Sequence, residues 1–159
     1  MTLALGIDPG TATTGYGLVR LEEDGSLSAV KYGVILTPKE STAAARLAML
    51  YDKMRDLLHE YRPETAAVEK LFFQRNVTTA LAVGQARGVV ILCLQQVGIE
   101  AFEYTPNEIK QAVAGYGSAQ KRQVQEMVRA LLGLESIPRP DDAADALAVA
   151  ITHLHTKRY

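Results

Sequence analysis

Four acidic residues stand where strand and helix patterns bring carboxylates together. Asp8 closes the apolar run at residues 3–7, and Glu69 closes the run of small residues in "TAAVEK". Asp142 and Asp145 are three residues apart in "DDAADALAVAI", so on a helix they project from one side near its start. Lysines and arginines nearby do not match these acids in number. Since unpaired charges in apolar surroundings are costly, the cluster predicts protonated carboxyls or a bound cation.

Ligands that are all carboxylates favour Mg²⁺, or Mn²⁺, over zinc or copper. A structural zinc site is not expected, because the chain has one cysteine and three histidines. Two hard cations about 4 Å apart can cleave a phosphodiester: one helps to deprotonate the attacking water, and the other stabilises the leaving 3′-oxygen. The sequence therefore predicts a two-ion site, with Asp8, Glu69, Asp142 and Asp145 as metal ligands.

Each acid also has a purely structural interpretation. An aspartate before Pro-Gly is common in turns, and Glu69 could pair with Lys70 or Arg75. Acids in the first turn of a helix are favoured by its dipole, and Asp141 is interpreted as the cap of that helix. The combination of all four acids favours a shared metal-binding role over these separate structural explanations.

The elements that must position these acids follow from residue periodicity and turn residues. Strands are predicted at residues 3–7, 14–21, 28–37, 65–71 and 99–105. Helices are predicted from Ser41 or Thr42 to Arg62, from Asn76 as cap through Gln96, and over 106–114, 119–132 and 141–155. An antiparallel meander followed by parallel crossovers is an α/β pattern. It resembles the ribonuclease-H-like (RNase-H-like) fold: one domain over 1–159, with a five-stranded mixed sheet flanked by helices.

Composition limits the classes of protein. A chain of 159 residues with 48% apolar residues suits one globular domain. The sequence has no run of about 18 uninterrupted apolar residues, so no membrane span is predicted. It has no basic leader before its first apolar run, so no signal peptide is predicted. Cys93 is predicted to be a buried thiol, which fits a reducing cytoplasm. The net charge of −1 does not by itself indicate nucleic acid, although residues 106–133 carry four basic and two acidic side chains.

Five segments together resemble one family, the RuvC family of bacterial Holliday junction resolvases. They are "LGIDPGTATTGYG", "AVEKLFFQRN", "VGQARGVV", "GSAQKRQVQEMV" and "DDAADALAVAITH", in the family's order and over essentially the whole chain. The resemblance implies a homodimeric endonuclease that makes two symmetric nicks in a four-way DNA junction, with the branch-migration complex RuvA–RuvB as partner. The family's four catalytic acids match Asp8, Glu69, Asp142 and Asp145, and some members carry histidine at the position of Asp142.

The resemblance also implies which residues contact DNA. The aromatic residue that probes the junction matches Phe72, where stacking on an unpaired base would contribute about 1–3 kcal/mol. Phe73 is interpreted as partly buried or as a second stacking residue. Lys110 and Lys121 match basic residues near the scissile phosphate, and Lys121 is also counted with the catalytic residues. Further predicted contacts to phosphate are Arg75, Asn76, Arg87 and Arg122.

Other interpretations stay open from the residues alone. "GIDPGTATTGYG" also resembles the phosphate loop of actin-like ATPases, but these need a second domain for which 159 residues leave no room. Another RNase-H-like nuclease is the nearest rival, and a junction-binding module without activity would not need all four acids. The helix at 77–97 is apolar around much of its circumference, so it is either a core helix or one that also packs on a partner.

Overall fold

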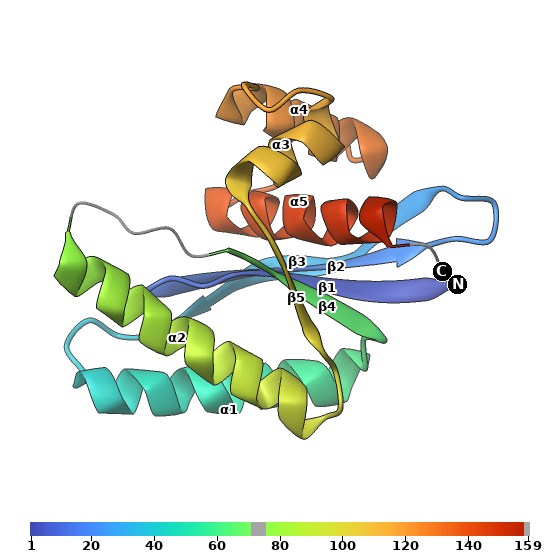
Figure 1. The fold of residues 1–159 in the computed structure, drawn as a ribbon. Coiled ribbons are helices and arrows are strands. Elements are labelled where there is room, and N and C mark those ends of the chain that lie inside the picture. Colours follow the sequence, from blue (N-terminus) through green and yellow to red (C-terminus); the bar gives the residue numbers. More distant parts are fainter. Residues whose placement is uncertain (71–75, 158–159) are drawn as a thin grey trace.

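A five-stranded sheet with helices on both faces forms the domain in the computed structural model, which describes residues 1–70 and 76–157 (Figure 1). The strands are β1 (Thr2–Asp8), β2 (Thr13–Leu21), β3 (Leu27–Leu36), β4 (Thr65–Glu69) and β5 (Ala101–Tyr104). The helices are α1 (Ala43–Tyr61), α2 (Val77–Gln96), α3 (Pro106–Ala114), α4 (Lys121–Leu131) and α5 (Asp141–Thr156). The element order confirms the predicted α/β pattern.

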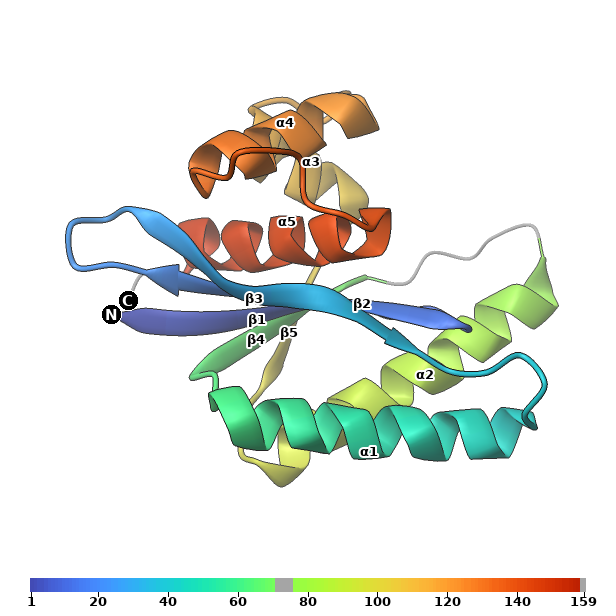
Figure 2. The ribbon, with the colours of Figure 1, turned by 180° about the vertical axis from the view of Figure 1, so that it is seen from behind.

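The sheet order is β3-β2-β1-β4-β5, with antiparallel pairing in the β1–β2–β3 meander and parallel pairing of β1 with β4 and of β4 with β5. Helices α1 and α2 cover one face, and α5 covers the other, with α3 and α4 packed outside it (Figures 1 and 2). This mixed topology is the RNase-H-like arrangement that the sequence pattern predicts.

Alternation along β1 divides the core into two layers. Leu3, Leu5 and Ile7 are buried with residues of α1 and α2, whereas Ala4 is buried with residues of α5. Because successive side chains of a strand point to opposite faces, Asp8 lies on the α5 side. The alternation of side chains along β1 therefore places Asp8 on the face of the sheet that α5 covers.

Helix ends follow the expected chemistry with one exception. The side chains of Thr42 and Asn76 cap α1 and α2, and Gly98, just after α2, has a left-handed φ of 78°. The prediction that Asp141 caps α5 is wrong: Pro140 is the cap residue, and Asp141 is the first residue of the helix. The predicted helix 119–132 is shorter, because Gln120 is the cap residue of α4.

Helix α2 is unusual in its exposure. Among the described residues, it is the one helix long and apolar enough to satisfy a length-and-composition test for a membrane span, a test that core helices of soluble proteins also pass. It packs on α1 with one side and exposes large apolar side chains elsewhere, namely Val77, Leu81 and Leu92. In the described ranges 1–70 and 76–157, these apolar side chains of α2 are thus left exposed.

Candidate active site

Two of the four acids meet because their strands are parallel neighbours. Asp8 is the last residue of β1 and Glu69 the last of β4, and the register pairs Ile7 with Val68. The carboxyl ends of parallel strands lie at the same edge of a sheet, so the two acids come out side by side. On the same face of each strand the preceding residue is small, Gly6 before Asp8 and Ala67 before Glu69, so a helix can approach this face closely.

Glycines let α5 lie directly on that face. A Cβ on Gly15, which pairs with Asp8, would lie 2.0 Å from the carbonyl oxygen of Asp142. A Cβ on Gly6 would lie 2.1 Å from the carbonyl oxygen of Ala146, and one on Gly17 would be 2.7 Å from the side chain of Leu147. Helix α5 therefore rests on bare backbone, and this close approach carries its acids to the end of β1.

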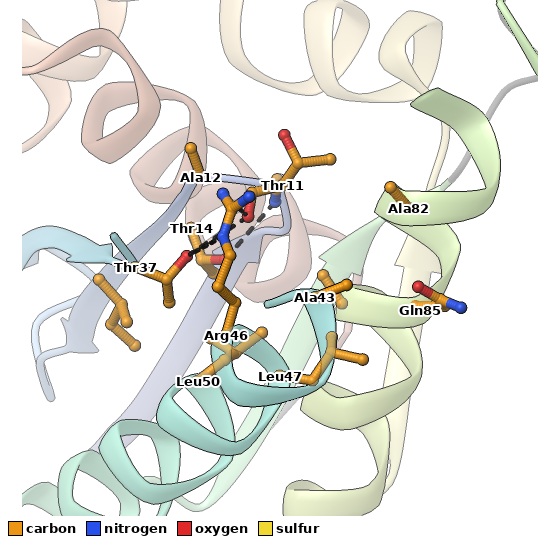
Figure 3. Close-up of a pocket in the computed structure, with 13 residues that line it drawn as sticks. Thr11, Ala12, Thr14, Thr37, Ala43, Arg46, Leu47, Leu50, Ala82 and Gln85 are labelled. Atoms are coloured by element: carbon orange, nitrogen blue, oxygen red, sulfur yellow. Dashed lines mark hydrogen bonds between the residues drawn. The ribbon is translucent and has the colours of Figure 1, made fainter. Parts of the chain in front are cut away.

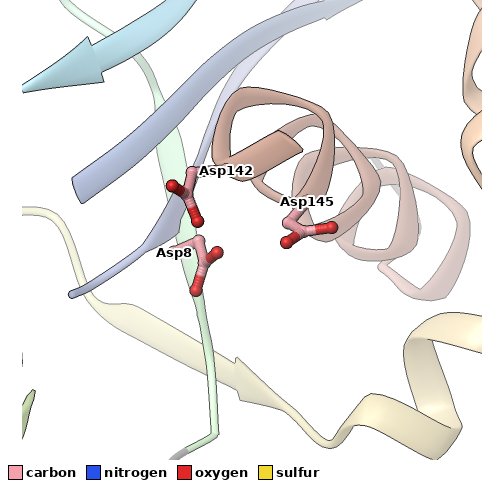
Figure 4. A group of neighbouring side chains, drawn as sticks. All are labelled: Asp8, Asp142 and Asp145. Atoms are coloured by element: carbon pink, nitrogen blue, oxygen red, sulfur yellow. The ribbon is translucent and has the colours of Figure 1, made fainter. Parts of the chain in front are cut away.

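Asp8, Asp142 and Asp145 form a compact cluster (Figure 4). One carboxylate oxygen from each lies within 4.8 Å of those of the other two. Ligand oxygens on opposite sides of a Mg²⁺ ion are about 4 Å apart, so small side-chain adjustments would let the three hold one cation. Asp142 and Asp145 come from adjacent turns of α5, as their spacing of three residues predicts.

The electrostatics of the cluster favour a cation. Burial first, and then the negative charges of Glu69 and Asp145, raise the pKa of Asp8 to about 8. Burial likewise raises the pKa of Glu69, and Asp145 adds to the effect. The pKa of Asp145 is also raised, first by burial. Carboxyls that resist ionisation in the metal-free protein are those whose charge a divalent ion would neutralise.

A lysine of α4 reaches the acids at the start of α5. Lys121 Nζ, at the start of α4, lies 3.7 Å from Asp145 Oδ2 and 3.6 Å from Asp141 Oδ2. Lys110 and Lys121 line a cleft of about 480 Å³ together with Glu69 and Asp145. Apolar residues also line this cleft, namely Pro106, Ile109, Val124 and Ala148. The two lysines predicted near the scissile phosphate thus border the acid cluster.

The other predicted DNA contacts are placed differently. Arg122 is exposed in the first turn of α4, beside Lys121. Asn76 is exposed, and its side-chain oxygen accepts a hydrogen bond from Thr79 N. Arg87 is largely covered and forms an ion pair with Glu103 of β5, so its guanidinium already has an anionic partner. Phe72, Phe73 and Arg75 lie outside the described residues.

The turn after Asp8 does not have the dimensions of a nucleotide site. The pocket behind it holds about 60 Å³, against roughly 300–1,000 Å³ for small-molecule sites. Arg46 reaches into it from α1 and donates to the Thr11 carbonyl oxygen at 2.9 Å and to Thr37 Oγ1 at 3.2 Å (Figure 3). The turn that resembles an ATPase phosphate loop is held by groups of the chain itself.

Three features of this region were not predicted from the sequence, although one of them had a signal in the residues. The glycines at positions 6, 15 and 17 had a readable signal, since alternate glycines on paired strands indicate close approach of another element. The clamp formed by Arg46 and the contact of Asp141 with Lys121 join segments far apart in sequence, and no local signal predicts them.

Known proteins are similar to this chain in both sequence and structure. Residues 4–153 match the family model described as "Crossover junction endodeoxyribonuclease RuvC". Proteins of that name from Syntrophomonas wolfei and a Roseiflexus species are 54% and 58% identical to the chain, each over 97% of it and over 89% and 91% of their own lengths. "T. thermophilus RuvC in complex with Holliday junction substrate" superposes with a TM-score of 0.88 at 36% identity, covering 96% of this chain and 93% of its own. The chain belongs to the RuvC family of crossover junction endodeoxyribonucleases.

Proposed function

We propose that this chain is a metal-dependent endonuclease that resolves Holliday junctions by paired, symmetric nicks, as part of DNA recombination and repair. The observation that carries the proposal is the convergence of acids from β1, β4 and α5 beside a cleft bordered by two lysines. The family supports the substrate, because a relative of the same fold is described in complex with a Holliday junction.

Asp8, Glu69, Asp142 and Asp145 are the proposed ligands of two Mg²⁺ ions, with Mn²⁺ as a substitute. Bound ions would activate the attacking water and stabilise charge on the leaving oxygen. The chain's own residues position these ligands, because the close contact of α5 with glycine backbone sets the distance between its acids and the end of β1. An acid cluster alone would repel DNA, so bound metal ions would also ease the approach of a phosphate to the site.

DNA contacts are proposed for basic and aromatic residues that lie beside the acids in the structure or close to them in the sequence. Lys110 and Lys121 border the cleft and would meet phosphates beside the cut, with Arg122 next to them on α4. Phe72, Phe73, Arg75 and Asn76 all lie within seven residues after Glu69, the last residue of β4. Arg87 is the weakest proposed contact, because Glu103 already neutralises it.

A homodimer is proposed through the exposed face of α2. At 100° per residue, Val77, Leu81, Gly88 and Leu92 fall within about 60° on one side of the helix, and all four are exposed. A glycine inside a helix costs about 1 kcal/mol relative to alanine, unless something must come close. A second copy of the same helix is an occupant that would use both the apolar stripe and Gly88, and a two-fold axis suits two symmetric cuts. This soluble assembly would act in the cytoplasm with the branch-migration complex RuvA–RuvB.

The substrate proposal is tested by offering four-way, three-way and linear duplex DNA, each with and without Mg²⁺. Paired nicks at symmetric positions, confined to the four-way DNA with Mg²⁺, are expected. Equal cutting of all three substrates would instead identify a general RNase-H-like nuclease.

The dimer is tested by light scattering of the Leu81→Lys variant, which places a charge in the apolar stripe. We expect a monomer, since burying an unpaired ammonium disfavours the interface. Leu36→Lys is the matched control, because Leu36 is 57% exposed on β3, against 65% for Leu81 on α2. A dimer that survives Leu81→Lys unchanged would contradict the assigned face.

A further inference from the structure

Asp141 lies next to the proposed metal ligands, yet its side chain faces a set of donors instead of the acid cluster. Its Oδ1 accepts from Arg139 Nη1 at 3.2 Å and from Gln125 Nε2 at 3.4 Å. Its Oδ2 lies 3.6 Å from Lys121 Nζ. Two donors on one oxygen fix the carboxylate so that the other oxygen faces the lysine.

Lys121 lies between two carboxylates. Its ammonium is 3.6 Å from Asp141 and 3.7 Å from Asp145, and no other acid in the described ranges 1–70 and 76–157 forms an ion pair with it. Lys121 and Gln125 are four residues apart on α4, so they share the helix face that looks onto the start of α5. The ammonium is thus shared by an acid of the cluster and an acid just outside it.

The geometry points to Asp141 as a positioning residue that tethers Lys121 at the mouth of the acid cluster, an inference that rests on the proposed metal site. With Asp141 present, the lysine has a carboxylate partner that a metal ion does not use. Without it, Asp145 is the remaining described partner, and the ammonium competes with the divalent ion for that carboxylate. Asp141 thereby keeps Asp145 available to a metal and keeps Lys121 beside the cleft, where phosphate would lie.

The test compares Asp141→Asn in two backgrounds by calorimetric titration of the DNA-free, full-length protein with Mn²⁺. In the wild-type background we expect the dissociation constant for Mn²⁺ to rise roughly two- to fivefold, the range of one exposed ion pair. In the Lys121→Met background we expect Asp141→Asn to change it little, because there is no ammonium to release. Asp141→Glu, which keeps the charge, should restore most of the wild-type affinity.

The controls separate the tether from simpler effects. Glu126→Gln removes the same charge from α4 at a residue that pairs with Arg129, and it should leave Mn²⁺ affinity unchanged. An equal loss from Asp141→Asn in both backgrounds would overturn the tether, since it would show a general loss of negative charge. If the wild-type protein bound no Mn²⁺ at all, the proposed metal site would fall and the tether with it. If it bound Mn²⁺ without coupling between Asp141 and Lys121, only the tether would fall.

Discussion

The contact between Gly15 and α5 makes a quantitative prediction about how the fold positions the acids. In Gly15→Ala, the added Cβ would lie 2.0 Å from the carbonyl oxygen and 2.5 Å from the carbonyl carbon of Asp142. A carbon and a carbonyl oxygen normally come no closer than about 3.3 Å, so α5 and β2 must separate by roughly 1 Å or more. Asp142 would move with the helix, whereas Asp8 would stay on β1. A misplacement of about 1 Å in a catalytic constellation can cost roughly 100-fold in rate.

The effect on folding should be smaller than the effect on catalysis. Overpacking a core typically costs about 1–3 kcal/mol, which for a domain of this size lowers the melting temperature by roughly 2–12 °C. The variant should therefore remain folded at 25 °C while nicking four-way DNA about 100 times more slowly at saturating DNA and Mg²⁺. Gel-shift titration of the same DNA without metal should show binding within a fewfold of the wild-type protein.

A matched glycine distinguishes this reasoning from a general sensitivity to alanine. A Cβ on Gly117 would have its nearest neighbour, the carbonyl oxygen of Asn107, at 3.9 Å, which is an ordinary contact. Gly117→Ala should therefore leave the nicking rate unchanged. A Gly15→Ala protein that nicked at the wild-type rate would refute the idea that the glycine contact sets the distance between α5 and β1.

Three further predictions concern other parts of the chain. His153 is buried against Thr65 and Tyr104, and burial lowers its pKa from 6.5 to about 4. The unfolded chain therefore binds the proton more readily, and through this residue the free energy of unfolding should fall by about 3 kcal/mol between pH 6.5 and pH 4. Urea unfolding at both pH values should show a smaller fall for His153→Gln than for the wild-type protein. An equal fall in the two proteins would contradict the lowered pKa of His153. Phe72→Ala should lower nicking of four-way DNA more than affinity, which rate and gel-shift measurements compare; lost binding with unchanged nicking would argue against stacking at the junction. Lys121→Ala should weaken DNA binding and flatten its dependence on salt by one phosphate contact, and an identical slope of log affinity against log salt would exclude that contact.

The acids of the site were predictable because their signal is local. Asp8 and Glu69 each end a strand whose period-2 pattern fixes the face of the side chain, and Asp142 and Asp145 follow helical spacing. The directions of strand pairing were predictable for a similar reason, since short turns make an antiparallel meander and longer crossovers make parallel pairs. The bounds of each element and the face on which its acid lies were thus largely predictable from the residues of that element.

The contacts that the residues did not predict join elements that are distant in the sequence. Asp141 was predicted to cap α5 because acids are common at helix starts, but Pro140 is the cap residue. The contact of the Asp141 carboxylate with Lys121 of α4 was not predicted. Arg87 remains a proposed phosphate contact, and its ion pair with Glu103 of β5 was not predicted. Neither partner can be found from the residues around it.

The assignment of the acids as a metal-dependent nuclease centre is tested most directly by Asp8→Asn. The change keeps the size of the side chain and removes one proposed ligand, so Mg²⁺-dependent nicking of a four-way junction should be lost. Binding of the same DNA at low salt should persist, because removing a negative charge also eases repulsion of phosphate. A variant that cuts the junction at the wild-type rate in Mg²⁺ would contradict the account.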